Sequence, residues 1–137
     1  MNALLEPQRP PVDLASPAAA QAALRSFWRL ADAWQLGVAE QMALLGVART
    51  TLYQWKQGKV GPLDRNVLER LSYLFGIYSA LQILLPDAAA ADAWVRQPNT
   101  AAPFGGQSAL SRMLAGNVSD LNLVRRYLDG VRGGGWS

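Results

Sequence analysis

Apolar residues recur at three- and four-residue steps along most of this chain, and glycines or prolines interrupt the pattern at short intervals. Leu24, Phe27, Ala31 and Trp34 are one example. This spacing places apolar side chains on one face of an α-helix, whereas a half-buried β-strand requires alternation with a period of two. No segment carries that alternation, so the sequence predicts an all-α fold of short helices that pack through their apolar faces.

The interruptions predict where the helices end. Gly37, Gly46 and Gly58 are expected to end the first three helices and Pro86 the fourth, which Gly76 could divide in two. Side chains that can cap the N-termini of the last three helices are those of Asp87, Ser108 and Ser119. The last helix is expected to end before the glycine run at 133–135. The expected helices begin near residues 21, 38, 48, 63, 88, 109 and 120.

Composition along the chain indicates three regions. Residues 1–20 contain four of the eight prolines and are expected to form a flexible arm, because proline fixes φ and removes a backbone donor. Residues 21–87 hold the first four helices. Residues 88–137 form a small helical module with an uncharged loop over residues 97–111 and a glycine-rich end. A module of this size has too small a core of its own, so we expect it to pack on a partner.

The amino-acid inventory excludes several classes of function. Cysteine and histidine are both absent, which excludes Cys/His zinc sites, thiol nucleophiles, disulfides and a Ser-His-Asp triad. Aspartates such as Asp87 lie at predicted helix ends, where capping accounts for them. We therefore predict no enzymatic activity, no metal and no cofactor.

The hydropathy pattern bears on where the protein acts. The longest uncharged apolar stretch, residues 71–86, falls short of the roughly 20 residues that span a bilayer. No basic segment precedes an apolar run at the N-terminus, as it would in a signal peptide. These features predict a cytoplasmic protein with no membrane segment.

Residues 38–58 match the helix-turn-helix pattern. Gly46 allows the tight turn between two crossed helices. The residues expected to pin the second helix against the first are Met42, Val47, Leu52 and Trp55. The net charge of the whole chain is only +3, but residues 48–59 contain three cations and no acid.

Such a face suits a recognition helix, because Arg and Gln can read base edges while Thr, Tyr and Lys hold phosphates. The candidate DNA-binding residues are Arg49, Thr50, Thr51, Tyr53, Gln54, Lys56, Gln57 and Lys59. A polar helix face with a few cations is usually just solvated, but its combination with a glycine turn and apolar pins favours DNA binding. Trp55 falls three residues after Leu52 on the same face, so we favour a core position over base stacking.

The second half carries a further pattern: a Trp, a Pro-Asn loop, a Gly-containing helix start, a Gly stop, and a last helix running into a Gly-rich aromatic tail. The residues that carry it are Trp94, Pro98, Asn99, Gly106, Ser108, Leu110, Leu114, Gly116, Val124, Leu128, Gly130 and Trp136. With the preceding helix-turn-helix, the chain from about residue 24 resembles the Xre/MbcA/ParS antitoxin family. It departs from the family pattern at Ala109, where Pro is common, and in its glycine-rich ending.

The resemblance implies an antitoxin of a type II toxin–antitoxin system that silences a cognate toxin and represses its own operon. It also implies that the toxin is of the RES class, which consumes NAD. The expected partners are that toxin and operator DNA, with a homodimer that assembles into a higher-order complex with the toxin. The candidate toxin-binding residues are Arg125, Arg126, Leu128, Arg132, Gly133, Gly134, Gly135, Trp136 and Ser137.

Alternatives remain at this stage. Trp94 can be a core residue, the loop at residues 98–106 a plain surface loop, and the end of the chain a frayed terminus. The alternative function is a stand-alone helix-turn-helix repressor whose C-terminal module dimerises or senses a ligand. A toxic product of a neighbouring gene would favour the antitoxin.

Overall fold

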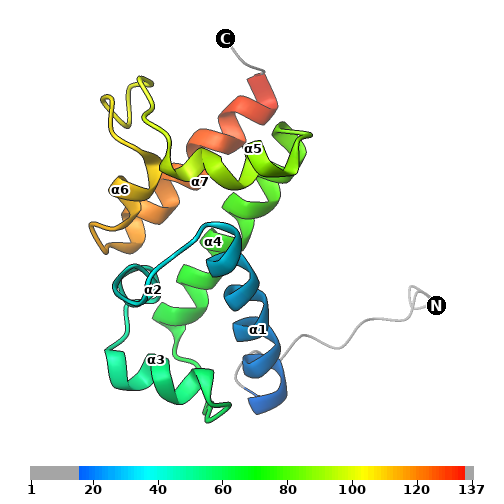
Figure 1. The fold of residues 1–137 in the computed structure, drawn as a ribbon, viewed down its shortest axis with the longest axis vertical. Coiled ribbons are helices and arrows are strands. Elements are labelled where there is room, and N and C mark those ends of the chain that lie inside the picture. Colours follow the sequence, from blue (N-terminus) through cyan, green and yellow to red (C-terminus); the bar gives the residue numbers. More distant parts are fainter. Residues whose placement is uncertain (1–15, 135–137) are drawn as a thin grey trace, which may run out of the picture.

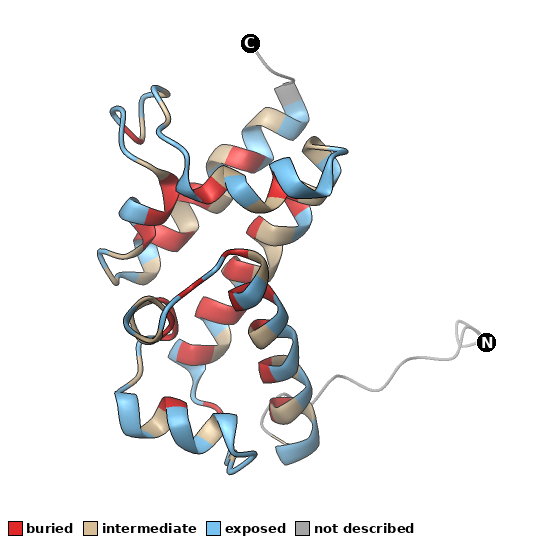
Figure 2. Cartoon of the chain, viewed as in Figure 1, coloured by how far each residue is buried: buried red, intermediate tan, exposed pale blue. Residues whose placement is uncertain are grey.

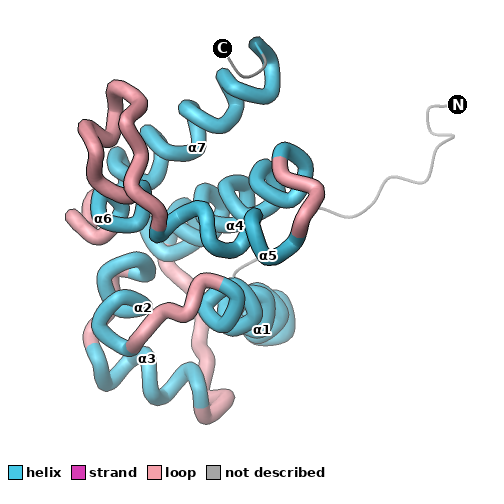
Figure 3. Tube along the Cα trace, turned by 45° about the horizontal axis from the view of Figure 1, so that its top comes forward, coloured by secondary structure: helices cyan, strands magenta, loops and turns pink. Residues whose placement is uncertain are grey.

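The structure, a computed structural model, describes residues 16–134, and within that range it contains helices and no β-strand (Figure 1; Figure 3). The predicted all-α class is therefore confirmed. The helices are α1 (Pro17–Ala33), α2 (Val38–Leu45), α3 (Arg49–Lys56), α4 (Arg65–Leu84), α5 (Ala88–Ala93), the 3-10 helix η2 (Trp94–Arg96), α6 (Ala109–Met113) and α7 (Val118–Gly134). In Figure 1, α1 to α3 gather around one end of α4, and α5 to α7 gather around its other end.

The first helix begins earlier than the sequence analysis predicted. Residues 17–20 were assigned to the arm, but α1 starts at Pro17. The Ser16 side chain accepts a hydrogen bond from the Ala19 amide at 3.2 Å, and proline suits the first turn of a helix, where its missing N–H has no intrahelical partner anyway. Ala20 is already buried. The remainder of the predicted arm, residues 1–15, lies outside the described residues.

The turn after α1 also differs from the prediction that Gly37 ends the helix. The residue with a left-handed backbone there is Gln35, with φ 55°, a conformation that costs a non-glycine residue about 1 kcal/mol. Gly37 is instead the N-cap of α2, in an extended conformation, and its amide donates to the Glu40 carboxylate at 2.9 Å.

The helix-turn-helix forms as predicted. Gly46 closes α2 with φ 68°, and the amides of Gly46 and Val47 both donate to the Met42 carbonyl. Leu52 is fully buried, and Trp55 is half-buried against the same core. Trp55 therefore has the packing role that was favoured over base stacking.

The long helix α4 is continuous, so Gly76 does not divide it. The helix starts two residues later than expected, at Arg65, because the Asp64 side chain caps it by accepting from the Val67 amide at 2.9 Å. α4 packs against α1 and α2 in one half and against α5 and α7 in the other. It is therefore the element that the two halves share.

The C-terminal half starts its helices with two of the three predicted caps. Asp87 accepts from the Ala90 amide at 3.3 Å, and Ser108 accepts from the Ser111 amide at 3.0 Å. The prediction that Ser119 caps the last helix is wrong, because α7 already begins at Val118. The side chain of Asp120, in the first turn of α7, accepts a hydrogen bond from the backbone amide of Asn117 at 3.3 Å. This bond stabilises the N-terminal end of α7.

The end of α7 is a second correction. The helix was expected to stop before the glycine run, but it continues through Gly134. Between η2 and α6 the chain forms the predicted loop, which closes through an isolated bridge between Pro98 and Ser108 and a hydrogen bond from the Gly106 amide to the Asn99 carbonyl at 2.8 Å.

A single apolar core runs through both halves, and the buried residues in Figure 2 line the inward faces of the helices. Phe27 and Trp34 from α1 and its turn belong to the same cluster as Met113, Val124 and Leu128. The C-terminal module thus buries its apolar face on α4 of its own chain. Across residues 16–134, no helix combines the length and the hydropathy needed to cross a membrane.

Candidate nucleic-acid interface and C-terminal surface

The eight candidate DNA-binding residues lie on α3 or in the turn that follows it. Leu52, fully buried, fixes one face of α3 on the core and so turns the opposite face to solvent. Exposed on that face are Thr50, Tyr53 and Gln54, and exposed at its edge or in the turn are Arg49, Lys56, Gln57 and Lys59, while Thr51 is half-buried. Tyr53 is one of two large apolar side chains exposed in the described part of the chain, at 42 %. The structure therefore brings the predicted residues together on one surface.

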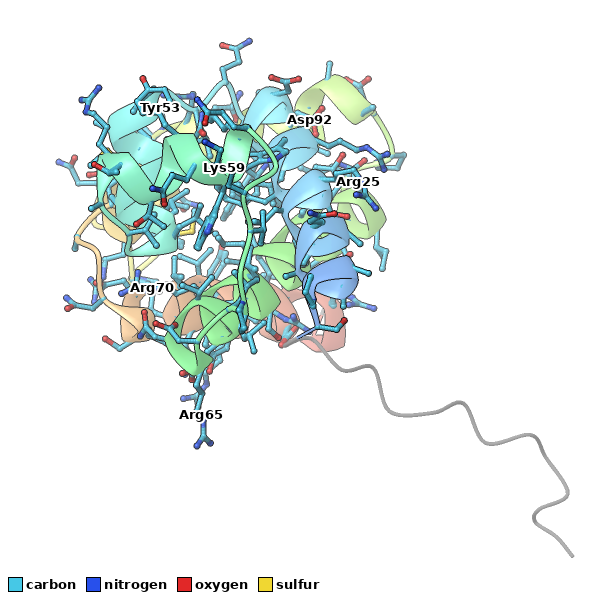
Figure 4. All side chains as sticks on the ribbon, turned by 90° about the horizontal axis from the view of Figure 1, so that it is seen from below. Arg25, Tyr53, Lys59, Arg65, Arg70 and Asp92 are labelled. Carbon is cyan, nitrogen blue, oxygen red and sulfur yellow. The ribbon has the colours of Figure 1, made fainter. Side chains whose placement is uncertain are left out.

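The side chain of Lys56, at the end of α3, faces α1. Its Nζ is 5.6 Å from the ring centroid of Trp28 and 5.8 Å from that of Tyr53, within the range of cation–π attraction. Beside it, a shallow groove between α1 and α3 is lined by Arg25, Trp28, Trp55 and Lys56 among others. Arg25 thus adds a further cation to the same side of the molecule as Tyr53 and Lys59 (Figure 4).

The turn between α2 and α3 is braced by Arg70, a buried residue of α4 with 8 % exposure. Its Nε donates to the Asn66 side chain at 2.8 Å, and its Nη1 donates to the carbonyls of Ala43 and Leu44 at 3.3 and 3.4 Å. Its Nη2 donates to the carbonyl of Gly116 at 2.8 Å. One guanidinium therefore joins the end of α2 to the turn between α6 and α7.

The turn between α1 and α2 is held by Arg96 of η2. Arg96 donates to the backbone carbonyls of Trp34 and Gln35 at 2.9 and 2.8 Å and to the Glu40 carboxylate at 2.8 Å. Burial by itself would raise the pKa of the Glu40 carboxyl, but hydrogen bonds from the Gly37 amide and from Arg96, with the Arg96 charge, hold that pKa below its ordinary value. Glu40 is therefore held in its charged form against the Arg96 guanidinium.

On α7 the predicted partner-binding residues fall into different environments. Leu128 is fully buried in the core of its own chain, so it is not available at the surface. Arg125 donates to Asp129 at 3.1 Å, and its guanidinium lies against Gly76, where a Cβ would collide with it. Exposed on α7 are Arg126, Arg132 and Gly133, and Gly134 is helical. The other three residues, Gly135, Trp136 and Ser137, lie outside the described part of the chain.

Trp94 is part of an aromatic cluster within the C-terminal half. Its ring stacks on Tyr127 at a centroid distance of 6.3 Å and meets Phe104 edge-on at 6.1 Å. Phe104 and Tyr127 are also edge-on, at 5.1 Å. The cluster anchors the 97–108 loop on α7, which supports the core interpretation of Trp94.

Both halves match known protein families. Residues 13–76 match the family described as antitoxin Xre-like helix-turn-helix domain, and residues 80–134 match the family described as antitoxin Xre/MbcA/ParS C-terminal toxin-binding domain. The chain belongs to the Xre/MbcA/ParS antitoxin family. It is thus an antitoxin of a toxin–antitoxin system, with a DNA-binding domain followed by a domain that binds a toxin partner.

The antitoxin is also similar to a curated protein of Sinorhizobium fredii (strain NBRC 101917 / NGR234), named uncharacterized protein y4oB. The two are 42 % identical over 132 residues, which cover 96 % of this antitoxin and 100 % of the relative. The similarity therefore extends over both matched domains. The name of the relative states no function.

Three arginines of the antitoxin were not among the predicted site residues. Arg25, Arg70 and Arg96 lie outside the helix-turn-helix segment, and each is brought to it by the packing of another helix. A charged residue on an amphipathic helix is usually solvated, so the sequence held no local signal for these contacts. In residues 16–134, no group of three or more carboxylates is placed to hold a metal ion.

Proposed function

We propose that this antitoxin represses its own operon by placing α3 in the major groove of operator DNA, and that it neutralises a RES-type, NAD-degrading toxin. The observation that carries the DNA part is the exposed, acid-free face of α3, opposite the buried Leu52. The RES class of the toxin rests on the resemblance of the chain from about residue 24 to antitoxins that pair with such toxins.

The dimensions and chemistry of α3 support this mode of DNA binding. An α-helix with its side chains is about 10–12 Å in diameter, which fits a major groove about 12 Å wide. Arg49 and Gln54 offer the donors and acceptors that read base edges, while Thr50, Lys56 and Lys59 suit phosphates. No side chain caps the start of α3, so its first amides remain available to a phosphate.

A homodimer on a two-fold operator is part of the proposal. A single α3 covers few base pairs, and dimeric helix-turn-helix proteins bind two half-sites about one helical turn apart. Sedimentation of the antitoxin with a duplex from the region upstream of its gene tests this. Two antitoxin chains per palindromic site support the dimer, and one chain per site contradicts it.

The double variant R49A/K56A tests the DNA interface. We expect weaker binding to the upstream duplex, and a salt dependence whose slope falls by about 1 for each bound chain, because the phosphate contact of Lys56 is lost. The matched control is R65A/R126A, which removes two exposed cations that belong to α4 and α7 rather than to α3. Equal affinity and equal slope in the two double variants, both folded by circular dichroism, would contradict the proposed interface.

For the toxin, we propose that the exposed side of α7 and the chain end cover the NAD cleft. Arg126 and Arg132 are exposed, and no ion pair within residues 16–134 involves them. Guanidinium groups pair well with carboxylates on a partner surface, and Trp136 is the type of residue that often anchors an interface. Leu128 is left out of this surface, because it is buried.

Co-expression with the product of the adjacent gene tests neutralisation. We expect the adjacent product to deplete NAD when expressed alone and the full antitoxin to prevent this, whereas the variant truncated after Gly130 and R126A/R132A protect less. The single variant R65A is the control for a lost surface charge. Full protection by the truncated chain would show that the chain end is not the inhibitory element. A neighbour that is toxic without NAD loss would exclude the RES class.

A further inference from the structure

The short helix α2 is held at both of its ends by arginines from other parts of the chain. Arg96, from η2, binds the turn before α2, and Arg70, from α4, binds the last turn of α2. Both arginines also connect α2 to the C-terminal half, Arg96 because it belongs to that half and Arg70 through the Gly116 carbonyl.

The surroundings of Arg70 indicate a specific task. A buried guanidinium has lost its hydration, so it needs acceptors in place of water. Arg70 has four such acceptors and no carboxylate, since no ion pair of the described residues includes it. Two of the acceptors are carbonyls in the last turn of α2, where the helix leaves its oxygens without intrahelical partners and carries partial negative charge. Arg70 thus caps the C-terminal end of α2 by donating to its free carbonyls.

Arg96 makes the corresponding contact at the start of α2. It binds the carbonyls of Trp34 and Gln35 in the turn and the Glu40 carboxylate in the first turn of α2. The same carboxylate accepts from the Gly37 amide. The start of α2 is therefore fixed to η2 through both backbone and side-chain atoms.

We propose that Arg70 and Arg96 are positioning residues for the recognition helix: they hold α2, and through the Gly46 turn α3, in a fixed orientation on the toxin-binding half. This inference rests on the proposed role of α3 in DNA binding. Neither arginine lies on α3, so each acts through α2.

The test compares R70M, R96M and the control R65M in the full-length antitoxin. Methionine keeps most of the side-chain volume while removing the guanidinium. Arg65 is on the same helix as Arg70 but exposed, and it projects from the opposite edge of the molecule to Tyr53 and Lys59 in Figure 4. Each variant is titrated at one salt concentration with the duplex upstream of the gene and with a scrambled duplex of equal length.

We expect R70M and R96M to bind the upstream duplex about tenfold more weakly, the loss typical of one misplaced base contact. Binding to the scrambled duplex should change no more than in R65M, since it depends on charge rather than on the orientation of α3. A general loss of folding would weaken binding to the upstream duplex and to the scrambled duplex alike. Folded R70M and R96M that bind the upstream duplex as tightly as R65M overturn the inference.

Amide hydrogen exchange of the DNA-free antitoxin gives a second result. In R70M, amides of α2 and α3 should exchange faster while those of α1 stay protected, and unchanged exchange in α2 and α3 overturns the inference regardless of DNA. If R70M does not fold, R96M and R70K replace it, because lysine keeps the charge but cannot span the four acceptors. A wild-type antitoxin that does not prefer the upstream duplex contradicts the proposed DNA function itself, and the inference falls with it.

Discussion

Gly46, in the turn between α2 and α3, has two separate reasons to be glycine. Its φ of 68° lies in the left-handed region, and a Cβ there would lie 2.8 Å from Cζ and Nε of Arg70. The first reason concerns the backbone of the turn alone. The second concerns the contact between α4 and α2, so a side chain at Gly46 would displace the buried guanidinium.

The variants G46A and G58A separate these two effects. Gly58 has a φ of 85°, and a Cβ added there would meet open space, so G58A should lower the free energy of unfolding by only the backbone term of about 1 kcal/mol. We expect G46A to lower it by roughly twice that amount, because Arg70 must also move. Urea denaturation measures both values. Equal losses in G46A and G58A would show that Arg70 adapts without penalty.

The Glu40 carboxylate predicts a pH dependence of stability. Its pKa is below the ordinary value of 4.5, so its contribution is fully present above that pH and is lost as the pH falls through the lowered pKa. The pair with Arg96 is partly exposed, so E40Q should remove only about 0.5 kcal/mol at neutral pH. Urea denaturation should give a smaller difference between wild type and E40Q at about pH 3 than at about pH 7. A difference that grows on acidification would contradict the assignment.

At the scale of elements, α4 and α7 meet through a glycine. Gly76 lies in the middle of α4, where alanine would ordinarily be favoured by about 1 kcal/mol. The Arg125 guanidinium occupies the place of the missing side chain. The glycine therefore serves the contact between the two helices rather than a break in α4.

A double-mutant cycle tests this role of Gly76. In the R125A background, G76A should stabilise the protein by about 1 kcal/mol, because the helix gains alanine and loses no contact. In the wild-type background the gain should be smaller or reversed, since Arg125 must leave α4. Thermal and urea denaturation of the four proteins measure the difference. Equal effects of G76A in both backgrounds would show that Arg125 and Gly76 are independent.

The two faces of α7 should respond differently to truncation of a side chain. L128A creates a cavity in the core and is expected to lower the free energy of unfolding by about 2–5 kcal/mol. R126A changes an exposed residue, so its effect should stay within about 0.5 kcal/mol. Chemical denaturation of both variants measures this. A small loss in L128A would indicate that Leu128 is not in the core and is available to a partner.

Amphipathic spacing, together with caps and composition for the short helices α5 and α6, predicted all the helices, but the element boundaries depended on details that these patterns do not carry. Pro17 was counted with the arm because of the other prolines, although a serine followed by proline is itself a helix start. The start of α7 was placed at Ser119 because serine is a common cap, whereas Asp120 reaches back to the Asn117 amide. Glycines 133 and 134 have low helix propensity but follow a long established helix.

The site was predictable where it is contiguous in sequence and not where it depends on packing. The residues of the exposed α3 surface are neighbours in sequence on one short helix, so the sequence was sufficient to group them. Arg70 and Arg96 contact groups 26 to 62 residues away, which no local pattern encodes. Leu128 was predicted as a toxin contact, and only the structure of the whole chain shows that it packs in the core instead.

For the whole molecule, the shared core predicts that the two halves depend on each other for stability. Removal of everything after residue 84 would expose the faces of α4 that α5 and α7 cover. We expect this shortened chain to lose cooperative thermal unfolding, because much of the apolar area of α4 would face water. Circular dichroism during heating measures the transition. A sharp transition near that of the full chain would show that the N-terminal half folds on its own.

The acceptors at the junction between the halves are mostly backbone atoms. The carbonyls of Trp34, Gln35, Ala43, Leu44 and Gly116 receive bonds from the two arginines. Every residue type has a carbonyl, so substitutions at those five positions leave the acceptor in place as long as the chain follows the same path. Apart from Arg96, which the junction requires, the side chains on the surface of the toxin-binding half can therefore diverge, and with them the choice of toxin, without loss of these hydrogen bonds.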